Sequence, residues 1–189
     1  DYAALKDAIA WSVRFLDNTI DMSRYPLQEI TDMVRGNRKI GLGVMGFADM
    51  LYQLGIPYNS EEALQAAGEM MRFIQEASHE TSQALAEERG VFVNWERSIF
   101  KDKDIKLRNA TTTTIAPTGT LSIIAGCSSG IEPLFALSFV RTVMDNDKLM
   151  EVNPVFEKVA KDRGFYNPEL MDQIARKGSI HEMEGIPED

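Results

Sequence analysis

Cysteine is nearly absent from this sequence, since Cys127 is the only one among 189 residues. One thiol excludes both a disulfide framework and a zinc site built from several cysteines, and it favours a reducing, cytoplasmic location. Positive charge is also scarce, because 20 Lys and Arg stand against 29 Asp and Glu, for a formal charge of −9. An acidic chain repels phosphate backbones. We therefore expect no direct binding to nucleic acid.

A long apolar run is missing as well. Ala110 to Ile131 forms 22 residues without a charge, but this stretch is rich in Thr, Ser and Gly rather than in large apolar side chains. A membrane-spanning helix needs about 20 predominantly apolar residues. We therefore expect the stretch to be buried and to form a site, with no membrane anchor. The opening Asp1-Tyr2 also lacks the basic-then-apolar order of a signal peptide.

What remains is the composition of an ordinary globular protein, with 44% hydrophobic and 26% charged residues. A chain of this size can bury roughly two-thirds of its surface, which excludes a disordered or collagen-like protein. We expect residues 1–189 to form a single domain or a large part of one. The last residues, 179–189, are polar and acidic, and we expect them to be a frayed tail.

Apolar periodicity predicts helices in the first half of the chain. The first helix has an apolar face made by Leu5, Ile9, Val13, Leu16 and Ile20. A short second helix is expected to start near Pro26 and to stop at Gly36, with Leu27, Ile30 and Val34 pointing inward. A third is expected over residues 47–54, where Phe47, Leu51 and Leu54 are followed by Gly55.

A long helix is predicted between Asn59 and Gly90. Asn59 is its expected N-cap and Glu62 the partner in a capping box. Its apolar stripe consists of Leu64, Ala67, Met71, Ile74, Ser78, Thr81 and Leu85. At about 1.5 Å per residue this helix would be roughly 45 Å long.

The second half mixes short strands with capped helices. The segment 91–93 is expected to be extended and the mixed-charge stretch up to Lys106 to be a surface loop. Thr111–Ala116 is the best strand candidate because it is rich in β-branched residues, and Phe135–Val143 is a weaker one. Two helices are expected near the C-terminus, each opened by Asn-Pro and closed by Gly. Their limits are Asn153 and Gly164, then Asn167 and Gly178.

The first motif that could carry chemistry is Gly41–Gly46, which reads GxGxxG. Such glycines bind the pyrophosphate of a dinucleotide when a buried strand precedes them. The preceding residues 35–40 are too polar for such a strand, and the next 40 residues or so are expected to be helical. We therefore interpret the motif as a glycine-rich helix entry that permits close packing. A nicotinamide-dependent dehydrogenase remains an alternative function.

The second motif is the segment from Thr111 to Ile124, in which a strand leads through Pro117 into a turn of small residues. Free amides at a helix N-terminus, with the hydroxyls of Thr118, Thr120 and Ser122, could bind a phosphate or diphosphate. A side chain at Gly119 would hold the anion away from those amides. The alternative is a turn whose hydroxyls only cap the helix, and the spacing alone does not decide between the two.

The third motif is Gly126–Pro133. Cys127 has no histidine near it in sequence, so we expect a small buried residue rather than a nucleophile. Glu132 lies in an uncharged stretch, and a buried carboxylate there would need a partner, either an arginine or an ordered amide group. The two histidines, His79 and His181, lie far apart without further ligands, and we expect no metal site.

The three motifs resemble the large catalytic subunit of ribonucleotide reductases. The similarity is carried, in matching order and spacing, by Arg38–Phe47, by Arg108–Thr111 with Pro117–Thr120, and by Ser128–Pro133. It covers essentially the whole chain. The form of the second and third blocks is more similar to the adenosylcobalamin-dependent class than to the class with a separate radical-generating subunit.

The resemblance implies a fold and a role. The family fold is a ten-stranded α/β barrel, of which this predominantly helical piece would supply the later part. The family loop that matches Pro117, Thr118, Gly119, Thr120 and Leu121 holds the phosphates of a ribonucleoside di- or triphosphate, which agrees with the second motif and adds Ser122 as a neighbour. The implied cofactor is adenosylcobalamin, and the implied partners are the remainder of the reductase chain and a second copy of it.

The resemblance also shows what the chain does not contain. The family needs a radical-forming cysteine in an N-x-C-x-E loop and a redox-active cysteine pair, and Cys127 fits neither, so no catalytic residue is expected here. We expect part of a ribonucleoside reductase that is inactive alone. The alternative from another class is a non-catalytic helical module whose long stripe, Leu64–Leu85, docks a partner.

Overall fold

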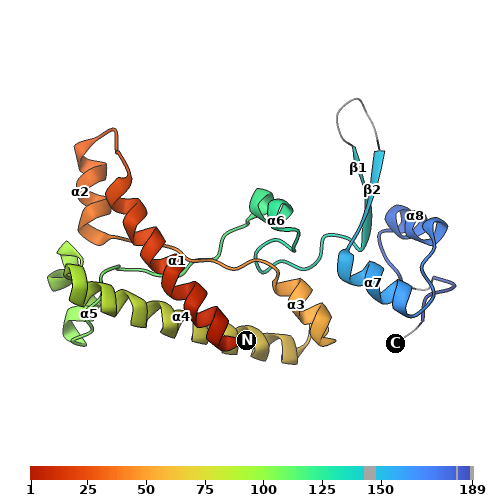
Figure 1. The fold of residues 1–189 in the computed structure, drawn as a ribbon, viewed down its shortest axis with the longest axis horizontal. Coiled ribbons are helices and arrows are strands. Elements are labelled where there is room, and N and C mark those ends of the chain that lie inside the picture. The colour runs from red at the N-terminus through yellow and green to blue at the C-terminus, as the bar shows by residue number, and fades with distance from the viewer. Residues whose placement is uncertain (143–147, 182, 188–189) are drawn as a thin grey trace. The chain divides into compact units, whose positions relative to one another are not determined.

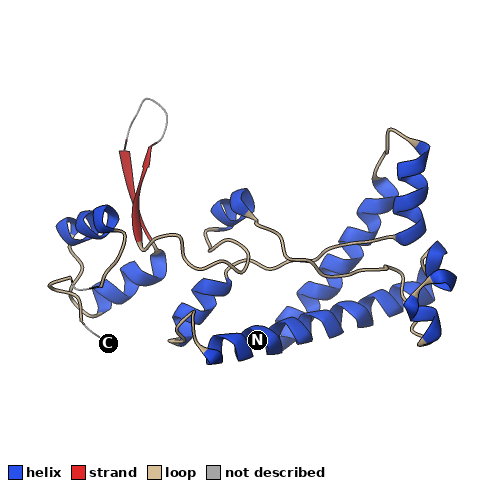
Figure 2. Cartoon of the chain, turned by 180° about the vertical axis from the view of Figure 1, so that it is seen from behind, coloured by secondary structure: helices blue, strands red, loops and turns tan. Residues whose placement is uncertain are grey.

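Helices dominate the structure, a computed structural model that describes residues 1–142, 148–181 and 183–187 (Figures 1 and 2). The chain forms two compact units. The first consists of Asp1–Val44 and Asn59–Ala116, and the second of Met45–Tyr58 and Pro117–Asp189. Among the described residues, no helix is both long enough and apolar enough to cross a membrane.

The first unit contains four α-helices and a short 3-10 helix within its described residues. They are α1 (Tyr2–Met22), α2 (Gln28–Asn37), α4 (Glu61–Arg89), η1 (Val93–Arg97) and α5 (Ile99–Asp102). The expected surface loop before Lys106 therefore contains η1 and α5, and the segment 91–93 forms no strand. Phe92 and Trp95 are buried there with Leu107, which gives this stretch a small core that its charge pattern does not reveal.

The core of the first unit lies between α1 and α4. Ile9, Val13 and Ile20 of α1 pack with Ile74 and Leu85 of α4, and all five side chains are nearly inaccessible to solvent. This confirms the predicted inward face of α1 and the main part of the predicted stripe of α4. The stripe is covered within the chain over this part, which leaves little of it for a docked partner.

The start of α4 differs from the prediction. The N-cap of α4 is Ser60, whose hydroxyl accepts from the Ala63 amide at 3.1 Å, so the predicted cap at Asn59 and its capping box with Glu62 are wrong by one residue. Near this end of the helix Ala63 is buried, whereas Leu64 is 67% exposed. Leu64 is therefore not part of the buried stripe.

The helix α2 also differs from its prediction. Leu27 and Ile30 are 58% and 39% exposed, so they do not point inward. Gly36 is not the stop but lies buried inside the helix, where a Cβ would come within 2.8 Å of Nδ2 of Asn94. The residue with the left-handed backbone is Arg38, at φ 45°. Close packing against η1 explains the glycine better than helix termination does.

The predicted strand at Thr111–Ala116 is extended but makes only one isolated parallel bridge, between Leu42 and Thr113. Around it, the Leu42 amide donates to the Thr112 carbonyl at 2.8 Å, and the Thr114 amide donates to the Leu42 carbonyl at 3.1 Å. A parallel strand is stable when neighbours flank it in a larger sheet. With one neighbour only, the segment does not extend into a full ladder.

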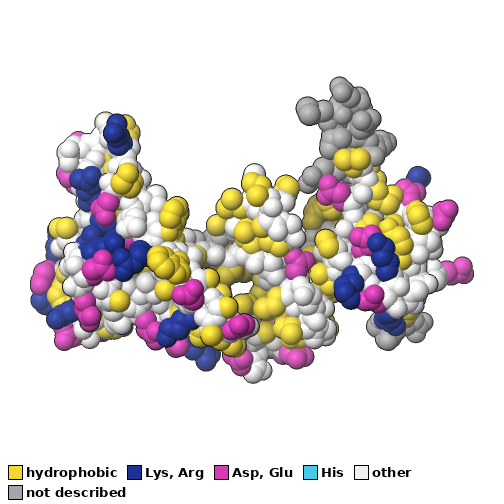
Figure 3. Space-filling model, in the orientation of Figure 1, with side chains coloured by type: hydrophobic (Ala, Val, Ile, Leu, Met, Phe, Trp, Pro, Cys, Tyr) yellow, Lys and Arg dark blue, Asp and Glu magenta, His cyan; other side chains and the backbone are white. Residues whose placement is uncertain are grey.

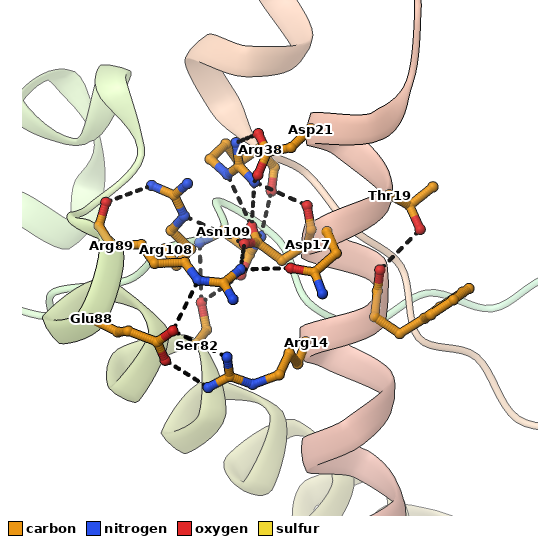
Figure 4. Close-up of polar contacts among 12 residues, drawn as sticks. Arg14, Asp17, Thr19, Asp21, Arg38, Ser82, Glu88, Arg89, Arg108 and Asn109 are labelled. Atoms are coloured by element: carbon orange, nitrogen blue, oxygen red, sulfur yellow. Dashed lines mark hydrogen bonds and ion pairs between the residues drawn. The ribbon is translucent and has the colours of Figure 1, made fainter.

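A buried carboxylate joins these elements (Figure 4). The Asp17 side chain, from α1, is fully inaccessible. Its Oδ1 accepts from Nε and Nη2 of Arg38 at 2.9 and 2.8 Å and from Nδ2 of Asn109 at 3.0 Å. Its Oδ2 lies 3.2 Å from Nη1 of Arg89 and 3.5 Å from Nε of Arg108. Several charged donors thus compensate the loss of water around one buried anion.

Arg38 also has a second, more exposed partner. Its Nη1 donates to Oδ1 of Asp21 at 2.8 Å, and the Asp21 side chain is 50% exposed. This hydrogen bond lowers the pKa of Asp21 below its ordinary value. Burial disfavours the charged guanidinium, but the hydrogen bonds to Asp21 and Asp17 outweigh burial and raise the pKa of Arg38.

The second unit contains short helices and one hairpin within its described residues. They are α3 (Phe47–Leu54), α6 (Gly119–Ala125), β1 (Ser138–Thr142), β2 (Lys148–Val152), α7 (Pro154–Asp162) and α8 (Pro168–Lys177). The strands pair antiparallel, with Ser138 opposite Val152. The predicted strand at Phe135–Val143 is confirmed over the residues of β1, and its last residue lies outside the described residues.

The core of the second unit lies between α7 and α8. Phe156 packs with Leu170, Met171 and Ile174. The predicted caps of these helices are confirmed, because the side chains of Asn153 and Asn167 accept from amides of the first turns. Partly buried residues of the C-terminal segment contact the same core; these are Ile180, Met183 and Ile186.

We predict that Asp17→Asn lowers the free energy of unfolding by about 3 kcal/mol, because it leaves the buried Arg38 without its fully buried partner. Urea unfolding followed by tryptophan fluorescence measures this. Asp21→Asn is the matched control, and its half-exposed carboxylate should contribute less than about 1 kcal/mol. Equal losses of unfolding free energy for the two variants would contradict the conclusion that Asp17 is the more important partner of Arg38.

Candidate functional site

The glycines of the GxGxxG segment permit close packing at Gly41 and a turn at Gly46. A Cβ on Gly41 would lie 2.8 Å from Cγ2 of Thr114, so this glycine permits close approach of the two extended segments. Gly46 has φ 76° and is the N-cap of α3, a conformation that favours glycine. The helix α2 runs through Asn37, which leaves no room for a buried strand before Gly41. The dinucleotide-binding interpretation is therefore not supported.

The second motif forms a tight entry into α6. Thr118 is its N-cap with a left-handed backbone at φ 54°, and its side chain does not cap the helix. Instead its Oγ1 accepts from the Gly130 amide at 2.7 Å. A β-branched residue rarely adopts a positive φ, and this contact with the third motif helps to hold it there. The hydroxyl of Thr118 is therefore not a helix cap.

Ser122 links the second and third motifs a second time. Its side chain is buried, with the hydroxyl donating to the Gly119 carbonyl at 3.2 Å and lying 2.8 Å from Oγ of Ser129. With these two partners, the hydroxyl of Ser122 stabilises the turn. The structure brings the second and third motifs into one cluster, which their separate sequence patterns do not indicate.

Gly119 has no reason in its own surroundings to be glycine. It is the first residue of α6, its φ is not positive, and no atom of the described residues beyond its neighbours along the chain lies within 4 Å of a Cβ placed on it. The first amides of a helix lack intrahelical acceptors, and the side chain of the cap residue does not supply one. An open glycine next to such amides permits an anion to approach.

A cavity of about 610 Å³ adjoins this turn. Its lining includes Gly119 and Ser122 of the second motif and Cys127, Ser129 and Glu132 of the third. Further lining residues come from α3, the strands and the start of α7; they include Asp49, Phe139, Glu151 and Asn153. Of the other predicted site residues, Pro117, Thr120 and Leu121 are exposed and are not part of this lining.

Two expectations about the third motif are wrong. Glu132 is exposed and lines the cavity rather than being buried. Cys127 is partly accessible and lines the same cavity instead of being fully buried. Burial first, and then the negative charge of Asp49, raise the pKa of the Cys127 thiol. The thiol therefore stays protonated at neutral pH.

Asp49 is a site residue that the sequence patterns did not reveal. From the first turn of α3 it accepts the Ser128 amide at 2.5 Å through Oδ2 and Nδ2 of Asn153 at 3.3 Å through Oδ1. Its sequence signal is weak, since an acidic residue early in a helix is explained equally well by the helix dipole.

The histidine on the long helix takes part in a polar contact. Nε2 of His79 lies 2.5 Å from Nε2 of Gln75, and burial lowers the pKa of His79. Within residues 1–142, 148–181 and 183–187, no group of three or more His, Cys, Asp and Glu is placed to hold a metal ion.

Comparison with known proteins gives consistent matches over the whole chain. A family model described as "Ribonucleotide reductase, barrel domain" matches residues 1–106 and 103–189. A vitamin B12-dependent ribonucleoside-diphosphate reductase of Thermoplasma acidophilum is 55% identical over 95% of this chain and 23% of its own length. One of Mycobacterium tuberculosis is 49% identical over 99% of this chain and 27% of its own length.

A more distant match is the ribonucleoside-diphosphate reductase subunit alpha of Chlamydia pneumoniae, which is 31% identical over 99% of this chain and 22% of its own length. The chain therefore spans about a quarter of the length of these relatives.

We predict that the Cys127 thiol is alkylated by iodoacetamide more slowly than a free cysteine at pH 8, because its raised pKa leaves less thiolate. Asp49→Asn removes one of the two causes, so the pKa should fall and the rate should rise, by about tenfold for each full unit of pKa. Mass spectrometry of the peptide carrying Cys127 measures the rate. Asp172→Asn on α8 is the control and should leave it unchanged.

Proposed function

The chain belongs to the ribonucleotide reductase barrel-domain family, and from this premise we propose that it is one part of a ribonucleoside-diphosphate reductase. In this proposal the loop Pro117–Ser122 binds the substrate phosphates. The names of the relatives favour a diphosphate substrate over a triphosphate. Reduction by two thiols needs two cysteines, and Cys127 is the only one here. The radical and redox cysteines therefore belong to other parts of the parent protein.

The observation that carries this proposal is the open position of Gly119. In the part of the chain that the structure describes, neither backbone conformation nor packing explains a glycine there, and Gly119 stands at the N-terminus of α6 beside a cavity. Amides at a helix N-terminus bind phosphate because they donate hydrogen bonds and the helix dipole favours negative charge. A glycine at this point lets the phosphate oxygens reach the amides.

The negative charge of the cavity lining limits where the phosphates can bind. Among the described residues, its lining contains Asp49, Glu132 and Glu151 but no Lys, Arg or His. The phosphates therefore bind at the amides of the loop rather than deep among the carboxylates. Their negative charge is compensated by backbone dipoles and by groups from the remainder of the parent protein.

We extend the proposal to the fold of the parent protein. A parallel pair such as Ile40–Leu42 with Thr111–Thr114 belongs in a sheet covered on both faces, and here it has only one bridge. The helix α6 also exposes apolar side chains, seen over it in Figure 3; Leu121, Ile123 and Ile124 are 60%, 61% and 78% exposed. Further strands of a ten-stranded α/β barrel would pair with the open edges and cover these side chains.

The cofactor of the parent protein is adenosylcobalamin in this proposal, since the relatives are named vitamin B12-dependent. The cavity beside α6 is too small to enclose it. A cavity of about 610 Å³ is in the range that suits drug-sized ligands, whereas a corrin ring with its adenosyl group is much larger. The cofactor site then lies at least partly in other parts of the parent protein.

We predict that Gly119→Val in the full-length reductase weakens binding of a ribonucleoside diphosphate by about tenfold or more, because a branched side chain blocks the amides. Isothermal titration calorimetry with the diphosphate measures the affinity. Gly68→Val is the matched control, since Gly68 also lies in a helix, has no positive φ and has open space where a Cβ would stand. Unchanged affinity for Gly119→Val would refute the phosphate role.

A further inference from the structure

The third motif is fixed to the start of α3 through one residue, Ser128. The Gly46 amide donates to the Ser128 carbonyl at 2.8 Å. The Ser128 amide donates to Oδ2 of Asp49 at 2.5 Å, and the Asp49 amide donates to the Ser128 hydroxyl at 3.4 Å. Only the carboxylate bond depends on a side chain of α3. A backbone amide donating to a carboxylate makes a charge-assisted hydrogen bond, about twice as strong as a neutral one.

The next two residues, Ser129 and Gly130, connect Ser128 to the phosphate loop through hydrogen bonds. The Ser129 hydroxyl lies 2.8 Å from that of Ser122, and the Gly130 amide donates to Oγ1 of Thr118 at 2.7 Å. Thr118 has a left-handed backbone that a β-branched residue adopts only when its surroundings hold it. The conformation of the turn into α6 therefore depends on where the segment 128–130 is held.

Asp49 also reaches the far side of the cavity. Its Oδ1 accepts from Nδ2 of Asn153, while Oδ1 of Asn153 accepts from the Val155 and Phe156 amides at the start of α7. One carboxylate thus ties α3, the third motif and the N-cap of α7 together around the cavity that it lines. Its connection to Gly119 runs through the segment 128–130 and Thr118.

We infer that Asp49 is a positioning residue, which holds the segment 128–130 and thereby sets the turn at Thr118 and Gly119 for substrate phosphate. This inference rests on the proposed function of the loop. Asp49 acts on binding rather than on the chemical step, so its loss should change KM more than kcat. If the Asp49 carboxylate had only a structural role, its loss would lower stability and leave KM for the correctly folded enzyme unchanged.

The test uses the full-length reductase, with KM and kcat measured for a ribonucleoside diphosphate. Asp49→Ala should raise KM about tenfold and leave kcat within about twofold, because a charge-assisted bond to the loop is lost. Asp49→Asn keeps an acceptor for the Ser128 amide and should restore most of the wild-type KM. It also remains informative if the alanine variant does not fold. Asp172→Asn, on α8, should leave both constants unchanged.

Gly119→Val in the same assay separates the two proposals. If Gly119→Val raises KM and Asp49→Ala does not, the inference about Asp49 is overturned and the phosphate loop stands. If neither variant raises KM, both the phosphate-loop proposal and the inference about Asp49 are overturned. A fall in kcat and melting temperature for Asp49→Ala, with KM unchanged and no recovery in Asp49→Asn, would show a structural role and overturn the inference.

Discussion

The buried carboxylate of Asp17 is the interaction on which the first unit depends. It binds Arg38 and Asn109, which lie just before the two extended segments Ile40–Leu42 and Thr111–Thr114. A carboxylate without water needs several donors in fixed positions, so the two segments start in a fixed register. Each segment leads along the chain toward one of the glycine-containing motifs. The same motifs, with Ser128–Pro133, carry the resemblance to the reductase family.

Local signals in the sequence predicted much of the fold. Asn153 and Asn167 cap α7 and α8 as expected, and Gly55 and Gly90 end α3 and α4. These features depend on neighbours within four residues, where capping and backbone preferences act. The inward face of α1 was predictable for the same reason, since its period is that of a helix.

Contacts between distant residues were not predictable from these signals. Asp17 and Asn109 are 92 positions apart, and Asp49 and Ser128 are 79 apart. Asp17 lies on the buried face of α1 with Ile9, Val13 and Ile20, but that local pattern does not identify a partner so far along the chain. Asp49 has the pattern of an ordinary acid early in a helix. Glu132 was expected to be buried because its neighbours are uncharged, yet it is exposed. The motif blocks identified the candidate loop, but the link between Thr118 and Gly130 required the structure.

The central claim is that the loop at the start of α6 binds the phosphates of a ribonucleoside diphosphate. A crystal structure of the full-length reductase with this substrate bound tests it most directly. We expect phosphate oxygens within hydrogen-bond distance of the Gly119 and Thr120 amides, with the Gly130 amide still donating to the Thr118 hydroxyl. A substrate whose phosphates lie elsewhere, with the loop making no contact to them, would contradict it.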